Sequence, residues 1–225
     1  MIETGISFGG IHSFYDLNLI LSGSEIPPAK PKTTYVDIPG GDGSVDLTEA
    51  NGEVKYYDRD CKFIFTMNPS DDLSDRAFEA KKTEVSNLLN GKVFEIILDK
   101  DEEFYYSGRC EVNEYLSDKR IRQIVITAKV KPYKYRTVST VKWIENITAE
   151  PQTFIFRNSR MSVIPTIVCG HDTIVEFKGV TYELTSGMHK LPNIQFVEGD
   201  NKLVIADASG ESDSSVLIFY VEGEL

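Results

Sequence analysis

Apolar runs and alternating apolar–polar segments of strand length recur along this 225-residue chain and predict a fold built mainly of β-strands. In the first 130 residues the clearest of them are Lys62–Met67, Val93–Leu98, Phe104–Glu114 and Ile121–Val130. The charged segment Asp99–Glu103 and the segment Ser117–Lys119 are typical of turns between the last three. Because both turns are short, these three strands are predicted to form an antiparallel meander.

One segment, from about Leu73 to Asn90, has the spacing of an amphipathic helix instead. The apolar positions that share one helical face are Phe78, Val85, Leu88 and Leu89. The residues suited to cap its N-terminus and to oppose the positive end of its dipole are Ser70, Asp71 and Asp72. Gly91 is a natural stop after its C-terminus. We expect the helix to cover one face or one open end of the sheet.

The pattern changes after Pro132, where Lys131–Lys134 (KPYK) indicates a connector and shorter strands follow. The predicted strands of this second part are Thr153–Arg157, Thr166–Cys169, Ile174–Phe177, Val180–Leu184, His189–Leu191, Lys202–Ile205 and Val216–Val221. Lys178–Gly179 is a candidate two-residue hairpin turn, and Ala208–Ser215 is a candidate mobile loop. About seven short strands at this spacing suggest a small β-sandwich or jelly roll.

The segment Phe8–Ala50 is rich in glycine and proline, which restrict or permit particular backbone conformations, and it contains no catalytic motif. Glycine permits positive φ and proline fixes φ, so their density here specifies backbone shape. A proline-stiffened connector, Ile26–Lys32, leads to a glycine-rich corner that no nucleophile–base pair or metal-ligand cluster accompanies. Stiff surface segments lose little entropy on docking and therefore suit assembly contacts, although a simple turn between two strands would look the same. The candidate interface residues are Pro39, Gly40, Gly41, Asp42, Gly43 and Asp46.

Composition and charge indicate which classes of partner the chain is expected to bind. A hydrophobic fraction of 41% and a charged fraction of 26% are those of a soluble globular protein. The formal net charge is -11, with 16 basic and 23 acidic side chains in residues 1–132 and 8 and 12 in residues 133–225. Neither part is basic, so the counterion release that drives phosphate binding is missing and a nucleic-acid partner is not expected.

Nothing in the sequence indicates secretion or a membrane. The start of the chain, MIETGISFGG, lacks the basic and apolar regions of a signal peptide, and the run Leu17–Leu21 is far too short to span a bilayer. The three cysteines are far apart and lie in or beside strand-like segments: Cys61, Cys110 and Cys169. Small buried thiols and cytosolic synthesis are therefore expected.

No catalytic, metal-binding or cofactor-binding residue is predicted. The histidines, His12, His171 and His189, lack the spacings of metal or catalytic sites. The acidic turn Asp99–Glu103 lacks the glycine of a calcium loop. The sequence Gly40–Gly43 is followed by neither a Gly-Lys-Ser/Thr motif nor a helix, so a tight corner is expected there and not a phosphate loop.

Two rival classes of function stay open at this point. A sugar-binding adhesin would use exposed aromatic faces in the second part, where the candidates are Trp143, Tyr182 and Tyr220, although most rings of alternating strands face the core. An enzyme of unrecognised class would need a deep pocket with converging ionisable groups, and acidic pairs are too numerous for one to stand out.

An ordered set of segments resembles the distal tail protein (Dit) family of long non-contractile-tailed phages. In the N-terminal part these are FGGIHSFYDLNLIL, YVDIPGGDGSVDLTEA, LDKDEEFYYSGRCEVNEY and AKVKPYKY. NSRMSVIPTIVC, VEFKGVTYELTSG, KLVIA and the terminal YVEGEL are similar to that family's C-terminal β-sandwich. The resemblance covers nearly the whole chain. Lys178 departs from the asparagine that is common there, which bears only on the stability of the hairpin.

The resemblance implies a structural hub and not an enzyme. It implies a mainly β fold: an N-terminal β-barrel or sandwich domain with one helix (residues 1–132) and a C-terminal β-sandwich of jelly-roll or galectin-like type (residues 133–225). It further implies a ring, typically sixfold, between the tail-tube protein and the tail-associated hub protein, with a receptor-binding protein carried by the outer domains. The expected location is the virion tail tip or baseplate of a siphophage or prophage, after synthesis in the host cytoplasm.

Overall fold

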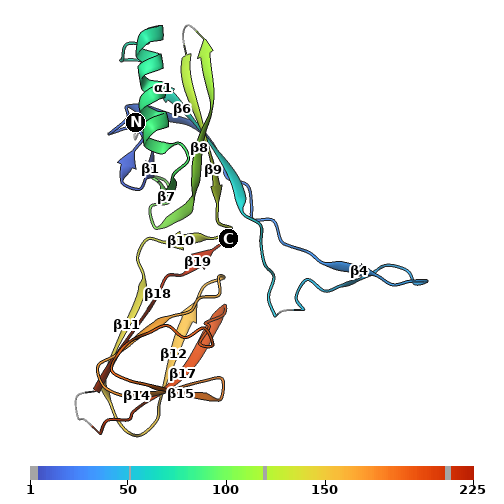
Figure 1. Cartoon of the computed structure of the whole chain (residues 1–225), viewed down its shortest axis with the longest axis vertical. Coiled ribbons are helices and arrows are strands. Elements are labelled where there is room, and N and C mark those ends of the chain that lie inside the picture. Colours follow the sequence, from blue (N-terminus) through green and yellow to red (C-terminus); the bar gives the residue numbers. More distant parts are fainter. Residues whose placement is uncertain (1–4, 51, 119–120, 211–213) are drawn as a thin grey trace. The chain divides into compact units, whose positions relative to one another are not determined.

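The computed structural model describes residues 5–50, 52–118, 121–210 and 214–225, with backbone only for residues 114–118. The chain divides into two compact units, Met1–Lys134 and Tyr135–Leu225. The fold is mainly β, as the sequence predicted, with one α-helix among the described residues (Figure 1).

Unit 1 is built on an antiparallel sheet. In spatial order its strands are β2 (Ile11–His12), β1 (Ile6–Phe8), β7 (Val93–Leu98), β8 (Phe104–Asp118), β9 (Ile121–Val130), β6 (Arg59–Met67) and β3 (Leu19–Glu25). The predicted meander is confirmed, because β7 pairs with β8 and β8 pairs with β9, both antiparallel. The short strands β1 and β2 were not predicted, since they lie in the glycine-rich N-terminal segment and carry almost no periodic signal.

Helix α1 (Asp75–Leu89) covers this sheet and buries Phe78, Val85 and Leu89 against it. Arg122 on β9 fixes the start of the helix, because its guanidinium donates to the carbonyl of Leu73 and to the carboxylate of Asp75. The same guanidinium lies 5.2 Å from the centre of the Phe78 ring. A buried charge on the sheet therefore holds the end of the helix that carries its largest apolar side chain.

The predicted N-cap residues were wrong and the predicted stop was correct. Ser74 caps the helix, since its hydroxyl accepts from the amide of Ala77 at 3.3 Å, while Asp72 instead accepts from Ser74. The three residues chosen from sequence, Ser70, Asp71 and Asp72, precede the cap in a turn of their own. Gly91 follows the helix with φ of 75° and donates its amide to the carbonyl of Cys110, which turns the chain into β7.

Gly108 of β8 lies where two strands approach too closely for any side chain. A Cβ atom there would lie 2.3 Å from the carbonyl oxygen of Lys129 and 2.6 Å from the Cα of Val130. We expect Gly108→Ala to lower the free energy of unfolding by about 1–3 kcal/mol, because the β8–β9 backbones must separate. Chemical denaturation measures the loss. Gly23→Ala in β3 is the control, since its Cβ would meet Ile64 at an ordinary 3.5 Å, and equal losses in the two variants would contradict this assignment.

Unit 2 is a sandwich of two four-stranded antiparallel sheets. One sheet has the order β11 (Thr140–Ile147), β18 (Ser214–Tyr220), β13 (Thr166–Cys169) and β16 (Gly187–His189). The other has the order β12 (Gln152–Asn158), β17 (Gly199–Asp207), β14 (Thr173–Phe177) and β15 (Val180–Leu184). Phe196 lies fully buried between the two sheets, stacked on Phe156 and edge-on to Tyr220. Two further short strands, β10 (Lys134–Arg136) and β19 (Gly223–Glu224), pair near the start of the unit.

Six of the seven strands predicted for this part are present, with end residues that differ by no more than three, and Thr166–Cys169 and Val180–Leu184 match at both ends. The seventh, His189–Leu191, was shifted, because β16 spans Gly187–His189. Strand β11 was missed: only Ile144 and Ile147 of its residues are buried, so it lacks an alternating pattern. The turn at Lys178–Gly179 is confirmed, with both residues at positive φ. Parts of the predicted turn Ser117–Lys119 and of the predicted loop Ala208–Ser215 lie outside the described residues.

The three cysteines are buried and unbonded, as the sequence predicted. Burial raises the pKa of the Cys61 thiol to about 11 and that of Cys110 to about 12, and it also raises the pKa of Cys169. Since the thiolate is the reactive species, we expect all three to resist iodoacetamide at neutral pH and to react together in denaturant. Mass spectrometry of the labelled protein measures this. Labelling of one cysteine in the folded protein would show that its segment opens.

Candidate assembly surface

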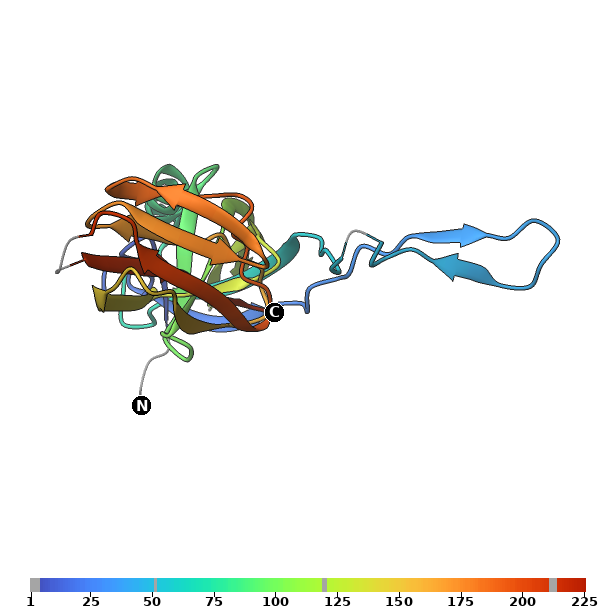
Figure 2. The same ribbon diagram turned by 90° about the horizontal axis from the view of Figure 1, so that it is seen from below.

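The glycine-rich segment forms an extended arm of unit 1, which we define as Lys30–Tyr57. Its outer part is a two-stranded antiparallel hairpin of β4 (Tyr35–Asp37) and β5 (Ser44–Asp46). Its inner part is held by backbone hydrogen bonds from Lys32 to Lys55 and from Tyr57 to Lys30. Figures 1 and 2 both show the arm pointing away from the sheet of unit 1. Every residue from Lys30 to Leu47 is exposed, so the arm contributes nothing to the core.

The backbone conformation at the tip of the arm explains why proline and glycine residues occur there. Gly41 donates its amide to the carbonyl of Ile38 at 3.1 Å, which closes a turn with Pro39 and Gly40 at its centre. Gly40 has φ of 75°, as the third residue of a type II turn requires, and Gly43 has φ of 78°. The sequence predicted a tight corner here, and in the structure this corner is the turn that connects β4 to β5. Pro39, Gly40 and Gly43 therefore shape the tip, while Asp42 is displayed on it.

The hairpin has one apolar face that nothing in the described part of the chain covers. Val36 lies directly opposite Val45 in the register, and Ile38 and Leu47 continue the same face. Their exposed fractions are 48% for Val36, 44% for Val45, 48% for Ile38 and 43% for Leu47. A two-stranded hairpin alone in water is only marginally stable. This hairpin therefore displays an aliphatic face to solvent.

The opposite face of the hairpin is polar and satisfied internally. Ser44 donates to Asp37 at 2.8 Å, and the amide of Thr48 donates to Asp46 at 2.9 Å. The pKa of Asp46 lies below its usual value, because hydrogen bonds from Thr48, with a smaller one from Tyr35, outweigh slight desolvation. Of the acidic residues predicted to lie at an interface, Asp46 therefore stabilises the arm itself. The sequence from residue 33 to residue 54 contains five carboxylates and no Lys or Arg, so the arm is also acidic.

Arg59 holds the base of the arm to the body of unit 1. Its buried guanidinium donates to the carbonyls of Pro132 and Pro27, and it lies 5.6 Å from the centre of the Tyr106 ring. The Tyr56 ring also packs edge-on against that of Tyr133. The predicted connector at Ile26–Lys32 is thus fixed at one end, which orients the arm. No sequence motif pointed to Arg59, although a charged residue at the start of an apolar strand was a weak signal.

His12 and His189 make hydrogen bonds with structural roles. His12 accepts from the amides of Phe14 and Tyr15 through Nδ1 and bonds Asp99 through Nε2 at 3.1 Å, so it caps a turn. His189 bonds the carbonyl of Thr185. The described residues contain no group of three or more His, Cys, Asp or Glu side chains placed to hold a metal ion. Within the same described ranges, no helix is long and apolar enough to cross a bilayer.

A groove of about 700 Å³ in unit 1 lies beside the end of helix α1 and is lined by residues of the paired strands β8 and β9. Both carboxylates and cations line it, including Asp60, Arg109 and Lys129, and Arg109 donates to the carbonyl of Gly91. Cys110 also lines it, and burial raises the pKa of its thiol to about 12, so this thiol is protonated at neutral pH.

The aromatic platform considered from sequence is not assembled. Tyr220 is buried and donates its hydroxyl to the carbonyl of Arg157, while Tyr182 is half-buried against the core of the sandwich. Trp143 is exposed on β11. The three rings therefore do not form one sugar-binding surface.

Comparison with known proteins gives a match of fold. No protein-family model matches the sequence, and no curated protein matches it. Among solved structures, the crystal structure of the SPP1 Dit (gp 19.1) protein, described as a paradigm of the hub adsorption apparatus in phages infecting Gram-positive bacteria, is similar at a TM-score of 0.70. The alignment covers 99% of each chain at 12% sequence identity. Through both of its units, this chain has the fold of a Dit hub protein.

Proposed function

We propose that this chain is a distal tail protein of a phage or prophage, a structural virion component that forms a ring at the tail tip or baseplate. Three findings support it: the Dit fold over 99% of the chain, the ordered Dit-like segments, and an exposed arm with an uncovered apolar face. The arm is the observation that carries the assembly role. An apolar hairpin face that is displayed in the single chain requires a partner in the functional state.

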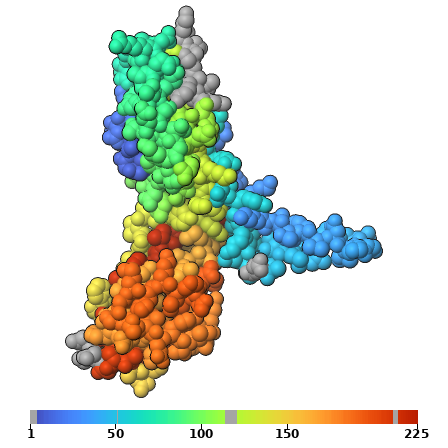
Figure 3. Space-filling view, in the orientation of Figure 1, coloured from blue at the N-terminus to red at the C-terminus, as the bar shows by residue number. Residues whose placement is uncertain are grey.

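The arm is proposed to dock on the next copy of the chain. A contact between the arm of one copy and a different surface of its neighbour is heterologous, and heterologous contacts close into rings when the rotation allows it. Figure 3 shows the arm extending away from the body of unit 1, and every residue from Lys30 to Leu47 is exposed to a neighbour. The ring is proposed to be sixfold and to join a tail-tube protein to a tail-associated hub protein. The outer domains are proposed to carry a receptor-binding protein.

A structural role without catalysis is part of the same proposal. The mixed charges of the groove beside α1 and the protonated Cys110 support it. The acidic character of the chain, with a net charge of -11, supports protein contacts in preference to direct contacts with nucleic acid. No cofactor is proposed.

Electron microscopy of the purified full-length protein, combined with analytical ultracentrifugation, tests the proposal. We expect rings with a central opening to appear as the protein concentration rises, with one sedimenting species whose mass is a fixed multiple of the chain mass. A protein that stays monomeric up to its solubility limit, with or without the other tail components, would overturn the ring.

A further inference from the structure

The outer face of one sheet of unit 2 is apolar across its whole width. The pairing register aligns Trp143 of β11 with Leu217 of β18, Leu217 with Val168 of β13, and Val168 with Met188 of β16. A second row aligns Val141, Phe219 and Thr166. Side chains of directly opposed residues on one face lie within contact distance. We call these seven residues the Trp143 face.

The Trp143 face is displayed and not part of the core. Trp143 is 64% exposed, Met188 is 71% exposed and Val141 is 60% exposed, while the middle residues of both rows are half-buried. The alternate positions on the same strands, Val216, Ile218 and Ile167, point into the sandwich and are buried. The large exposed side chains therefore come in addition to a complete core, and the fold does not require them.

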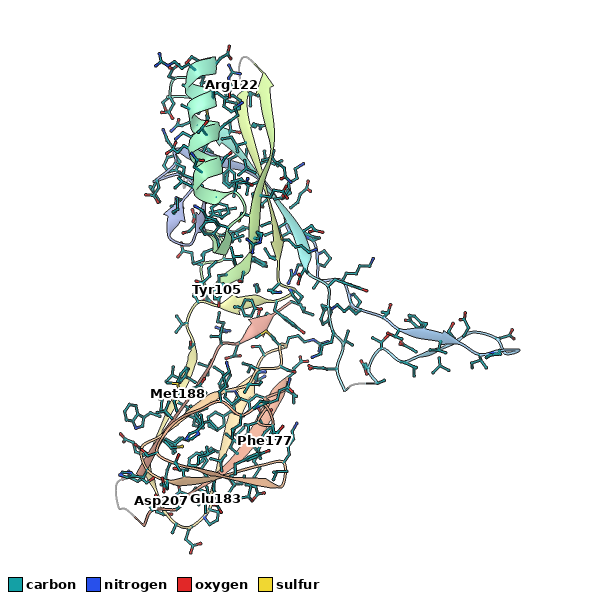
Figure 4. All side chains as sticks on the ribbon, in the orientation of Figure 1. Tyr105, Arg122, Phe177, Glu183, Met188 and Asp207 are labelled. Carbon is teal, nitrogen blue, oxygen red and sulfur yellow. The ribbon has the colours of Figure 1, made fainter. Side chains whose placement is uncertain are left out.

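The other sheet of the same sandwich shows what a solvated outer face looks like in this chain. Its cross-strand rows contain charged side chains throughout: Ile155 lies opposite Lys202, Arg157 lies opposite Asp200, and Ile174 lies opposite Glu183. Figure 4 labels Met188 on the first sheet and Glu183 on the second. Two sheets of equal size in one domain thus carry outer faces of opposite character. Absence of charge from both rows, together with a Trp and a Met at the two ends of the long row, is the composition of a protein interface.

We propose that the Trp143 face binds the Trp143 face of a second copy of the chain. The lack of charge on this face makes this occupant possible. Two copies that each carry a net charge of -11 repel one another, so they can pack closely only through a face without carboxylates, and neither row of the Trp143 face contains one. The rows contain no Lys or Arg either, so no charge on this face would attract a charged partner.

The order of residues in the long row also fits a two-fold contact. A two-fold axis parallel to the strands, through the middle of the row, lays Trp143 of one copy over Met188 of the other and Leu217 over Val168. A thioether against an aromatic ring is a favourable pair. The contact would bury on the order of 500 Å² of surface per copy. An aromatic side chain such as Trp143 buries at most roughly 150–250 Å², and the smaller residues of the face bury less. About 1,000 Å² in total is at the lower limit of specific interfaces, so the pairing is weak and depends on concentration.

This contact is separate from the proposed ring. A two-fold contact uses the same patch on both copies and closes after two, so it cannot be the contact that repeats around a ring of more than two chains. It also lies in unit 2, whereas the arm lies in unit 1. The two proposals can therefore fail independently.

The only tryptophan of the chain lies on this face, so its fluorescence reports directly on whether the face is covered. For the full-length protein at low concentration we expect the emission of a water-exposed indole and strong quenching by acrylamide. As concentration rises we expect a blue shift and a severalfold loss of quenching, in step with a rise in sedimenting mass. The double variant Val36→Thr/Val45→Thr, designed to disable the arm, should show the same blue shift without rings.

Met188→Glu is the decisive variant, because it places a carboxylate on the face and leaves Trp143 in place as the probe. We expect its emission to stay that of exposed indole at every concentration, with the far-UV spectrum unchanged. Ile155→Glu on the other sheet is the matched control, since Ile155 is 58% exposed, and it should behave like the parent protein. Equal behaviour of the two variants would overturn the pairing. So would emission that shifts only when a glycan or an unrelated tail protein is added.

Discussion

Phe78→Ala is expected to lower the free energy of unfolding of unit 1 by about 3–5 kcal/mol. Phe78 is buried on the face of helix α1 that packs against the sheet, and its ring also contacts the guanidinium of Arg122. Removal of the ring leaves a cavity between helix and sheet and removes the cation–π contact, so both losses act on the same element.

The two units allow this loss to be localised. The described α-helix lies in unit 1, while the single Trp143 lies in unit 2, so helical circular dichroism and tryptophan fluorescence follow different units. In chemical denaturation we expect the helical transition of Phe78→Ala to move to lower denaturant and the fluorescence transition to stay in place. Arg76→Ala, at an exposed position of the same helix, should change neither. An unshifted helical transition in Phe78→Ala would mean that the helix face is not enclosed.

Val36→Thr/Val45→Thr is expected to weaken ring formation by at least about 30-fold per contact. Threonine has the shape and strand preference of valine, so the hairpin can form, but each hydroxyl buried without a partner costs about 1–3 kcal/mol. Two such hydroxyls cost about 2–6 kcal/mol, and about 1.4 kcal/mol corresponds to a tenfold change in affinity. Sedimentation and electron microscopy at the concentration where the parent protein forms rings measure the effect.

Ser44→Thr on the polar face of the same hairpin is the matched control and should assemble normally. Substitution of Asp46 would be harder to interpret, because its carboxylate accepts a hydrogen bond from the amide of Thr48. A variant of Asp46 could therefore change the structure of the arm as well as its contact. Normal rings in the double valine variant would show that the apolar face does not carry the contact. The assembly surface would then lie on the exposed edge strands β2 and β3 of unit 1.

The sequence by itself determined the elements whose side chains repeat with a clear period. Val93–Leu98 was predicted to its end residues, because burial imposes the period on these residues. Of the face predicted for α1, Phe78, Val85 and Leu89 are buried and Leu88 is half-buried. Gly91 and Lys178–Gly179 were also predicted, since their conformation is decided locally by positive φ. The Dit-like fold itself followed from ordered segments spread along the chain.

Only the tertiary structure decided what depends on contacts between distant residues. The cap at Ser74 could not be separated from Ser70 by sequence, because Arg122, which holds the start of the helix, lies 48 positions further on. The corner at Pro39–Gly43 became the tip of an exposed arm because Arg59 fixes its base to Pro27 and Pro132. The Trp143 face arises from the register of four strands that are not consecutive in the chain. Local sequence encodes turns and periods, whereas a surface exists only once folding has brought its strands together.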